Sequence, residues 1–204
     1  INLPPMVTAL VFANLAVHGA RQFLPPRPGD WLILHLGFLP AVYGMADWPL
    51  WSKLAGPLAH QFLHDGWLHL GVNIGFLMAF GSGMERRLGP WRLLGFYLIC
   101  GVLAAVGHYI VYPGSTAALI GASGAISGLF GGLVRLMHRR GAAANHRLWL
   151  LVALWVGISL VFGATGVPGA GGDIAWAAHV GGFLAGLVLV GRFDPRRPDA
   201  GVIS

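Results

Sequence analysis

Gly121-Ala122-Ser123-Gly124-Ala125-Ile126-Ser127-Gly128 lies in an apolar stretch, between a loop at residues 112–114 and a basic cluster that begins at Arg135. A serine flanked by glycines adds little to a lipid-facing surface, because glycine has no apolar side chain and costs backbone entropy on folding. Polar groups inside membrane spans are costly and therefore mark functional positions by default. The stretch predicts a nucleophile, Ser123, at the start of a membrane helix.

The composition places the chain among membrane proteins. It is 56% hydrophobic and 10% charged, whereas soluble domains are about 25% charged. The 32 glycines favour closely packed membrane helices, since they stand among apolar residues. Cys100 is the single cysteine, so an internal disulfide is excluded and a buried, inert thiol is expected. The chain starts at Ile1 and shows no signal peptide, which leaves room for a preceding segment.

Six apolar segments come close to the roughly 20 residues that a spanning helix requires. They lie at about residues 5–20, 67–84, 91–112, 121–137, 148–165 and 174–191. The connection at 21–66 holds two apolar pieces too short to span, at 31–43 and 51–63, which predict interfacial helices. We therefore predict an all-α membrane protein with one domain over residues 1–204. Its fold would be a six-transmembrane-helix bundle with a long, partly embedded first outer loop.

The basic residues predict the orientation in the membrane. Ten of the 13 lie on one side of the predicted spans, after the second, fourth and sixth. By the positive-inside rule that side is cytoplasmic, so both termini face the cytoplasm and Ser123 lies toward the outer face. The same asymmetry argues against nucleic-acid binding as the reason for the net charge of +6.

Four polar residues share the outward half of the predicted spans: His69, Asn73, Ser123 and His179. A serine hydroxyl needs a nearby base to become a nucleophile, and histidine is the usual base near neutral pH. His179 is the candidate. His69 and Asn73 are four residues apart, so they lie on one helix face and can aim two donors at one oxyanion. No acid falls inside a predicted span, which favours a Ser-His dyad over a triad.

Glycines give the fourth and sixth spans small faces. Gly124, Gly128 and Gly132 recur every fourth residue, as do Gly182 and Gly186, and such faces let two helix backbones approach closely. Taken alone, this pattern favours generic helix packing without chemistry, because such faces are common in membrane bundles. Gly121 and Gly124 are further expected to open the backbone at the oxyanion site, beside the free N–H groups of the helix start.

Other polar residues have competing interpretations. Ser127 is the rival nucleophile, but it lacks the first-turn position and is expected to be auxiliary. His60 and His64 could form half of a metal site, yet a third ligand and the His-Glu-x-x-His pattern are missing. We expect these two histidines to lie at the interface, solvated or holding water, with His64 auxiliary to the site and with neither metal nor cofactor bound. His18, His35, His138 and His146 are also expected at the interface, and His108 as a packing residue.

These motifs, taken in order, resemble the rhomboid family of intramembrane serine proteases. Gly121-Ala122-Ser123-Gly124 is preceded by His64, His69 and Asn73 and followed by Ala178-His179-Val180-Gly181-Gly182. The resemblance covers about residues 60–191, the expected catalytic core. It implies Ser123 as nucleophile, His179 as its base, and His69 and Asn73 as oxyanion donors. It also implies cleavage of other proteins in or near their transmembrane segments.

Two departures from that family accompany the resemblance. Some members have an aromatic residue four positions after the nucleophile, stacked on the catalytic histidine, where this chain has Ser127. His179 must then be oriented otherwise, for instance through a hydrogen bond. The Trp-Arg pair often found in the first outer loop is not evident, although Trp51-Ser52-Lys53 is nearby.

The expected function is intramembrane serine endopeptidase activity through an acyl-enzyme. Its partners would be transmembrane protein substrates and the lipid bilayer, and its location a bacterial inner membrane with the active site toward the periplasm. The alternative is a proteolytically inactive relative that binds or escorts membrane clients. A small transporter would require paired polar sites in related halves, which are not found. The loop at 163–173 and the fifth span are expected to cap the site and gate it laterally.

Overall fold

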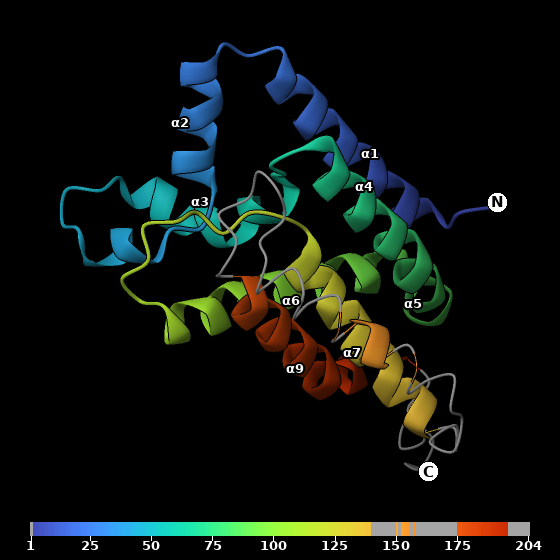
Figure 1. Cartoon of the computed structure of the whole chain (residues 1–204). Coiled ribbons are helices and arrows are strands. Elements are labelled where there is room, and N and C mark those ends of the chain that lie inside the picture. Colours follow the sequence, from blue (N-terminus) through green and yellow to red (C-terminus); the bar gives the residue numbers. More distant parts are fainter. Residues whose placement is uncertain (1, 140–149, 151, 156, 158–174, 196–204) are drawn as a thin grey trace.

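The computed structural model describes residues 2–139, 150, 152–155, 157 and 175–195. Within these ranges the chain is helical, and its only β pairing is one isolated bridge between Phe38 and Leu119. Figure 1 shows α6, α7 and α9 side by side, with α1 and the α4–α5 path beside them. The long helical segments are α1 (Pro5–Gln22), α4 (Trp67–Phe76), α5 (Ser82–Leu88), α6 (Pro90–Val111), α7 (Ser123–Arg139) and α9 (Ala175–Phe193).

Five of the six predicted spans coincide with helical segments. The second is longer than predicted, because α4 continues through a wide π-helical turn, η3 (Leu77–Gly81), into α5. The fifth, at 148–165, lies mostly outside the described residues, of which 150, 152–155 and 157 are helical. Within the described ranges, two helices, α6 and Trp176–Phe193, are long and apolar enough to cross a membrane. The count of six spans stays a prediction.

The first outer connection forms short helices, as its apolar pieces predict. They are α2 (Pro26–Leu36), η1 (Pro40–Gly44), α3 (Leu50–Ala59) and η2 (His60–Phe62). Trp31 and Trp51 are each 47% exposed, and the His35 ring stacks on the rings of Trp48 and Trp51. This exposed aromatic group has the composition of a membrane-interface belt.

Two local features fix the helix starts near the predicted cytoplasmic side. Pro5 and Pro90 stand at the first positions of α1 and α6, where a missing backbone N–H costs nothing. Gly89, at φ +81°, makes the sharp turn between α5 and α6. Glu85 is buried, and its carboxylate accepts the backbone N–H groups of Met6 (3.0 Å) and Val7 (2.8 Å) at the start of α1. A carboxylate placed there complements the positive end of the helix dipole.

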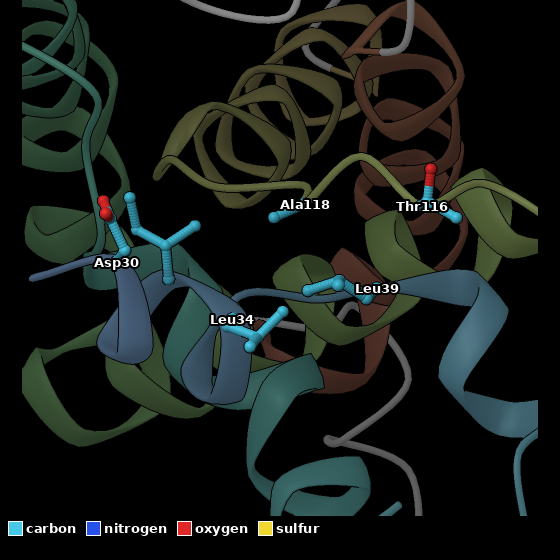
Figure 2. A pocket seen from close by; sticks show the side chains of 6 residues that line it. Asp30, Leu34, Leu39, Thr116 and Ala118 are labelled. Carbon is cyan, nitrogen blue, oxygen red and sulfur yellow. The ribbon is translucent and has the colours of Figure 1, made fainter. Parts of the chain in front are cut away.

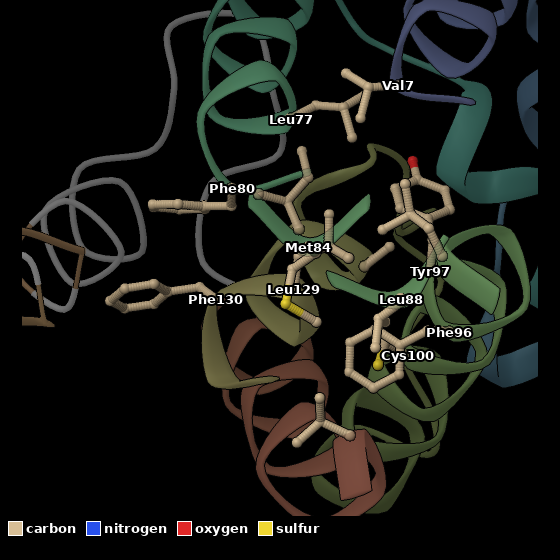
Figure 3. Close-up of a cluster of buried hydrophobic side chains, with 14 of the residues drawn as sticks. Val7, Leu77, Phe80, Met84, Leu88, Phe96, Tyr97, Cys100, Leu129 and Phe130 are labelled. Carbon is tan, nitrogen blue, oxygen red and sulfur yellow. The ribbon is translucent and has the colours of Figure 1, made fainter. Parts of the chain in front are cut away.

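The main hydrophobic core joins α6 and α7 to the α4–α5 path and α1. Figure 3 shows Phe96, Tyr97 and Cys100 of α6 near Leu129 of α7 and Met84 of α5. All five of these side chains are fully buried. Cys100 is a free, buried thiol, as the sequence predicts.

Helices α7 and α9 touch backbone to backbone. A Cβ on Gly182 would lie 2.0 Å from the carbonyl oxygen of Gly124, and one on Gly186 would lie 1.9 Å from that of Gly128. The predicted close contact is therefore confirmed for the glycines of α9. Cβ atoms on Gly124 and Gly128 would instead lie nearest Ala104 and Cys100 of α6, at 2.5 and 2.3 Å. Gly132 differs from the prediction, because it faces Met84 and Phe96, whereas Gly131 packs against the Phe183 carbonyl of α9.

Most of the described basic residues lie near the ends of α5, α7 and α9 or at the start of α6, whereas Arg21, Arg27 and Lys53 belong to α1, α2 and α3. Arg87 of α5 forms a bidentate ion pair with Asp194, at 2.7 and 2.9 Å, just beyond α9. Arg135 of α7 donates to the carbonyl oxygens of Leu187 and Val188 in α9. Ser123 stands at the opposite end of α7 from this basic group.

The glycine contact predicts a position-specific loss of stability. Gly186→Ala should lower the free energy of unfolding by about 1–3 kcal/mol, because the new methyl group meets backbone that cannot rotate away. Thermal denaturation in detergent measures this. Gly75→Ala is the matched control, since a Cβ on Gly75 of α4 meets nothing within 4 Å. Equal melting temperatures for the two variants would contradict the close approach of α7 and α9.

Candidate active site

Ser123 and His179 meet across the α7–α9 contact. The Ser123 Oγ lies 2.8 Å from the His179 Nε2, which is hydrogen-bond distance. Ser123 is the first residue of α7, and His179 lies in the second turn of α9. Gly182, three residues after His179, packs on the carbonyl of Gly124, the residue after Ser123. The absence of a side chain at Gly182 thus sets the short reach between hydroxyl and imidazole.

The helix start beside Ser123 carries backbone donors. The first N–H groups of an α-helix have no intrahelical acceptor, and here the first described bond into α7 is from Ile126 N to the carbonyl oxygen of Ala122 (3.0 Å). N–H groups at such a position, with the helix dipole behind them, can stabilise a negative oxygen.

His69 lies on the same side of Gly121 as the serine hydroxyl. A Cβ on Gly121 would stand 2.9 Å from the Nε2 and Cε1 of His69 and 3.8 Å from the Ser123 Oγ. The φ of +118° at Gly121 is a conformation that only glycine adopts readily. The loop can therefore bring the His69 ring and the Ser123 hydroxyl together only because residue 121 has no side chain.

Asn73 is one turn beyond His69 on α4 and is 5% exposed. Its Nδ2 donates to the His69 carbonyl at 2.8 Å, within its own helix. An amide has two N–H groups, so this bond leaves the second for another acceptor. The structure therefore places Asn73 on the same helix face as His69, as its spacing predicts.

The first outer connection holds the loop that precedes Ser123. The His60 carbonyl accepts the Gly121 N–H at 2.9 Å, and the His64 Nε2 lies 3.4 Å from the Ala122 nitrogen. His64 belongs to the connection before α4, outside the membrane-spanning helices. Burial, with smaller effects of the nearby His69 and His18, lowers the pKa of His64 to about 3. The ring is therefore neutral near pH 7, and its Nε2 can accept the Ala122 N–H.

The expectation that His60 and His64 are solvated at the surface is wrong, whereas bound water at these rings stays a prediction. His60, His64 and His18 are each 1% exposed or less. Their rings are enclosed because α1 packs against the end of the outer connection: the His18 ring meets Trp67 at 4.6 Å, and Arg21 donates to the His64 carbonyl. His35 is half-buried, and His108 is fully buried, as a packing residue would be.

Metal binding by His60 and His64 finds no support in their bonds. The His60 Nδ1 lies 3.1 Å from the Gly56 carbonyl, and the His64 Nε2 accepts from Ala122. Among the described residues, histidine, cysteine and acidic side chains do not form a group of three that could hold a metal ion.

Ser127 and Gly124 have local structural bonds and contacts. The Ser127 hydroxyl is buried and donates to the Ser123 carbonyl at 2.8 Å. The predicted opening of the backbone by Gly124 is not what the structure shows, because its missing Cβ would lie 2.5 Å from Ala104 of α6. Gly121 alone therefore opens the backbone beside the hydroxyl.

A surface hollow lies beside the loop that leads into α7. It is lined by Asp30, Ile33, Leu34 and Leu39 of the outer connection and by Thr116 and Ala118 of that loop (Figure 2). Ser123 and His179 do not line it. The predicted cap at 163–173 lies outside the described residues.

The comparison with known families matches most of the chain. Residues 50–193 match the family model described as Rhomboid domain. The chain belongs to the rhomboid family. A rhomboid is an integral membrane protein, which agrees with the apolar α6 and α9.

Curated rhomboid relatives occur in bacteria, fungi and plants. The chain is 33% identical over 153 residues to rhomboid-type serine protease 2 of Emericella nidulans, covering 74% of this chain and 28% of that protein. It is 30% identical over 143 residues to RHOMBOID-like protein 5 of Arabidopsis thaliana, covering 70% and 45%. With the rhomboid protease GlpG of Haemophilus influenzae it shares 29% over 162 residues, 76% of each chain. The chain thus spans less than half the length of the first two relatives.

Three contacts of this rhomboid are not predicted by the sequence patterns. The hydrogen bond from the Gly121 N–H to the His60 carbonyl joins two backbone groups, so it does not depend on which residue type stands at position 60. Glu85 caps α1 from 78 residues away, although a lone acid at a span end is a signal that could have been followed. Trp155 lies with its ring centroid 6.1 Å from that of His179, and an apolar segment rich in aromatics does not show which ring faces the site.

The geometry at Gly121 predicts a local loss of reactivity. Gly121→Ala should slow covalent inactivation by a fluorophosphonate by about tenfold or more, since small misplacements of a reacting group cost up to roughly a hundredfold. The alanine would strain the backbone at φ +118° and displace the His69 ring. Gly66→Ala is the control, because a Cβ there meets nothing within 4 Å. A Gly121→Ala protein that reacts as fast as this control contradicts the assigned geometry.

Proposed function

We propose that this rhomboid is an intramembrane serine endopeptidase that works through a Ser123–His179 dyad. The observation that carries the proposal is the 2.8 Å contact between the Ser123 Oγ and the His179 Nε2. A nucleophile and a base in hydrogen-bond reach are the minimum that acyl transfer requires. Membership of the family and the curated relatives that are called rhomboid proteases support the same reaction class.

In the proposed reaction, the neutral His179 Nε2 takes the Ser123 proton while the Oγ attacks the scissile carbonyl carbon. The negative oxygen of the tetrahedral intermediate is stabilised by the N–H groups at the start of α7, with His69 and Asn73 as side-chain donors. His179 then passes its proton to the leaving nitrogen, and an acyl-enzyme remains on Ser123. Water, deprotonated by His179, releases the acyl group by the same route.

The proposed substrates are the transmembrane segments of other proteins. Amides in a membrane helix are hydrogen-bonded and shielded, so the substrate must unwind locally beside Ser123. The proposed outer end of α7 is a suitable place for this unwinding, because the unwound part of the substrate would lie where it leaves the hydrocarbon region. We place the domain over residues 1–204, with a catalytic core at about 60–191.

The proposed location is a bacterial inner membrane with both termini in the cytoplasm. The ion pair between Arg87 and Asp194 and the contacts of Arg135 supply the support, since they join the basic ends of three helices on the side opposite Ser123. The positive-inside rule makes that side cytoplasmic, and the site then faces the periplasm.

The dyad predicts the effect of single substitutions on cleavage. In vesicles that hold the protein and a labelled transmembrane peptide, Ser123→Ala and His179→Ala should each lower the cleavage rate by about a thousandfold or more. The double variant should be no slower than either one, because members of a catalytic unit act together. Electrophoresis of the peptide over time measures the rate.

Ser127→Ala is the matched control. Its hydroxyl is bonded to the Ser123 carbonyl, so the variant should keep its rate within about threefold, as removal of a neutral hydrogen bond does at most. Loss of cleavage in Ser127→Ala together with activity in Ser123→Ala would reverse the assignment. Peptide binding without cleavage in the unaltered chain would identify an inactive, client-binding rhomboid instead.

A further inference from the structure

One of the two ring nitrogens of His179 has no hydrogen-bond partner within the described part of the chain. The Nε2 meets Ser123, while the Nδ1 is buried and makes no hydrogen bond among the described residues. In a triad, an acid on Nδ1 holds the ring in its working position. Here the ring must be held mainly by the side chains that pack against its faces.

Ser127 does not supply that restraint. It stands one turn after Ser123, where an aromatic ring could stack on the histidine, but its side chain is small. The Ser127 hydroxyl donates to the Ser123 carbonyl at 2.8 Å, and no described hydrogen bond joins it to His179. The restraint must come from another element.

Trp155 is the aromatic side chain nearest to His179 among the described ring contacts. The two ring centroids lie 6.1 Å apart, with 52° between the ring planes. Trp155 belongs to the helical stretch at 152–155, and it is 8% exposed. It therefore approaches the base from a helical stretch that is neither α7 nor α9.

Other rings hold Trp155 firmly in place. Phe76 of α4 packs on it edge-on, with centroids 5.0 Å apart. Phe80 of η3 and Phe130 of α7 each lie 5.9 Å from it. Aromatic pairs at such distances favour definite relative orientations. The indole is therefore held in one orientation and can pack against the imidazole.

We propose that Trp155 is a positioning residue for His179. By limiting rotation of the imidazole, the indole keeps the Nε2 directed at the Ser123 Oγ, in place of an acid on Nδ1 and of an aromatic at position 127. The inference rests on the proposed function, because it assigns a role relative to the Ser123–His179 dyad.

The test compares variants of the full chain in detergent. The second-order rate of inactivation by a fluorophosphonate, and kcat and KM for a small soluble ester, are measured for Trp155→Leu, Trp155→Met and Trp155→Phe. The leucine and methionine variants should lose about ten- to a hundredfold in inactivation rate and in kcat with KM unchanged, as expected for a misplaced base. Trp155→Phe keeps an aromatic face and should stay within about threefold, the scale of one weak packing contact.

Phe96→Leu is the matched control for core packing. Phe96 of α6 is fully buried in the main core, and its described ring contact is with Phe193, not with Trp155 or His179. Melting temperatures of all variants are recorded, and rates are compared between variants of equal stability. Phe96→Leu should lower the melting temperature while its inactivation rate stays within about threefold of the unaltered chain, because a core cavity acts on stability.

The outcomes separate the two proposals. Labelling of Ser123→Ala by the fluorophosphonate would refute the dyad itself. Should Ser123→Ala remain unlabelled while Trp155→Met and Trp155→Leu react as fast as Phe96→Leu, only the role of Trp155 is overturned. The role of Trp155 is also overturned if Trp155→Phe reacts as slowly as Trp155→Leu. If Trp155→Leu does not fold, the rate of Trp155→Met alone tests the role of Trp155.

Discussion

The contact between the backbones of α7 and α9 is the constraint on which the site depends. Gly182 and Gly186 rest on the carbonyl oxygens of Gly124 and Gly128, and any side chain at the first two positions would separate the helices. In a bilayer, apolar side chains gain little by leaving lipid for each other, so close van der Waals contact between small residues drives helix association. The same contact that holds the bundle together therefore sets the distance from the Ser123 hydroxyl to the His179 imidazole.

The other half of the site depends on the first outer connection. Its last residues reach the loop before α7, where the His60 carbonyl binds Gly121 and the His64 ring meets Ala122. Helix α1 supports these residues, because the Arg21 side chain donates a hydrogen bond to the His64 carbonyl. Two buried histidines, one through its backbone carbonyl and one through its ring, thus shape the loop at Gly121, beside which, in the proposed mechanism, the oxyanion forms. The connection is structural as well as interfacial, which its tryptophan-rich sequence alone does not indicate.

Sequence patterns could predict those parts of the site that depend on local spacing. The period of an α-helix puts His69 and Asn73 on one face, and the recurrence of glycine at every fourth residue indicates which faces of α7 and α9 meet. The patterns failed where long-range packing decides. They could not show that Gly131 rather than Gly132 meets α9, that His60 and His64 are buried, or that Glu85 caps α1. The residues next to a side chain in the sequence do not show what it packs against when its contact partner is 50 or more residues away.

The most direct measurement of the central claim is the chemical identity of the reactive residue. The chain in detergent is treated with a fluorophosphonate, digested, and the adduct located by tandem mass spectrometry. The account predicts a single adduct on Ser123 that is lost when the protein is denatured first or when His179 is replaced by alanine. An adduct on Ser127, or one on Ser123 that forms equally in the denatured chain, would contradict a hydroxyl activated by the folded dyad.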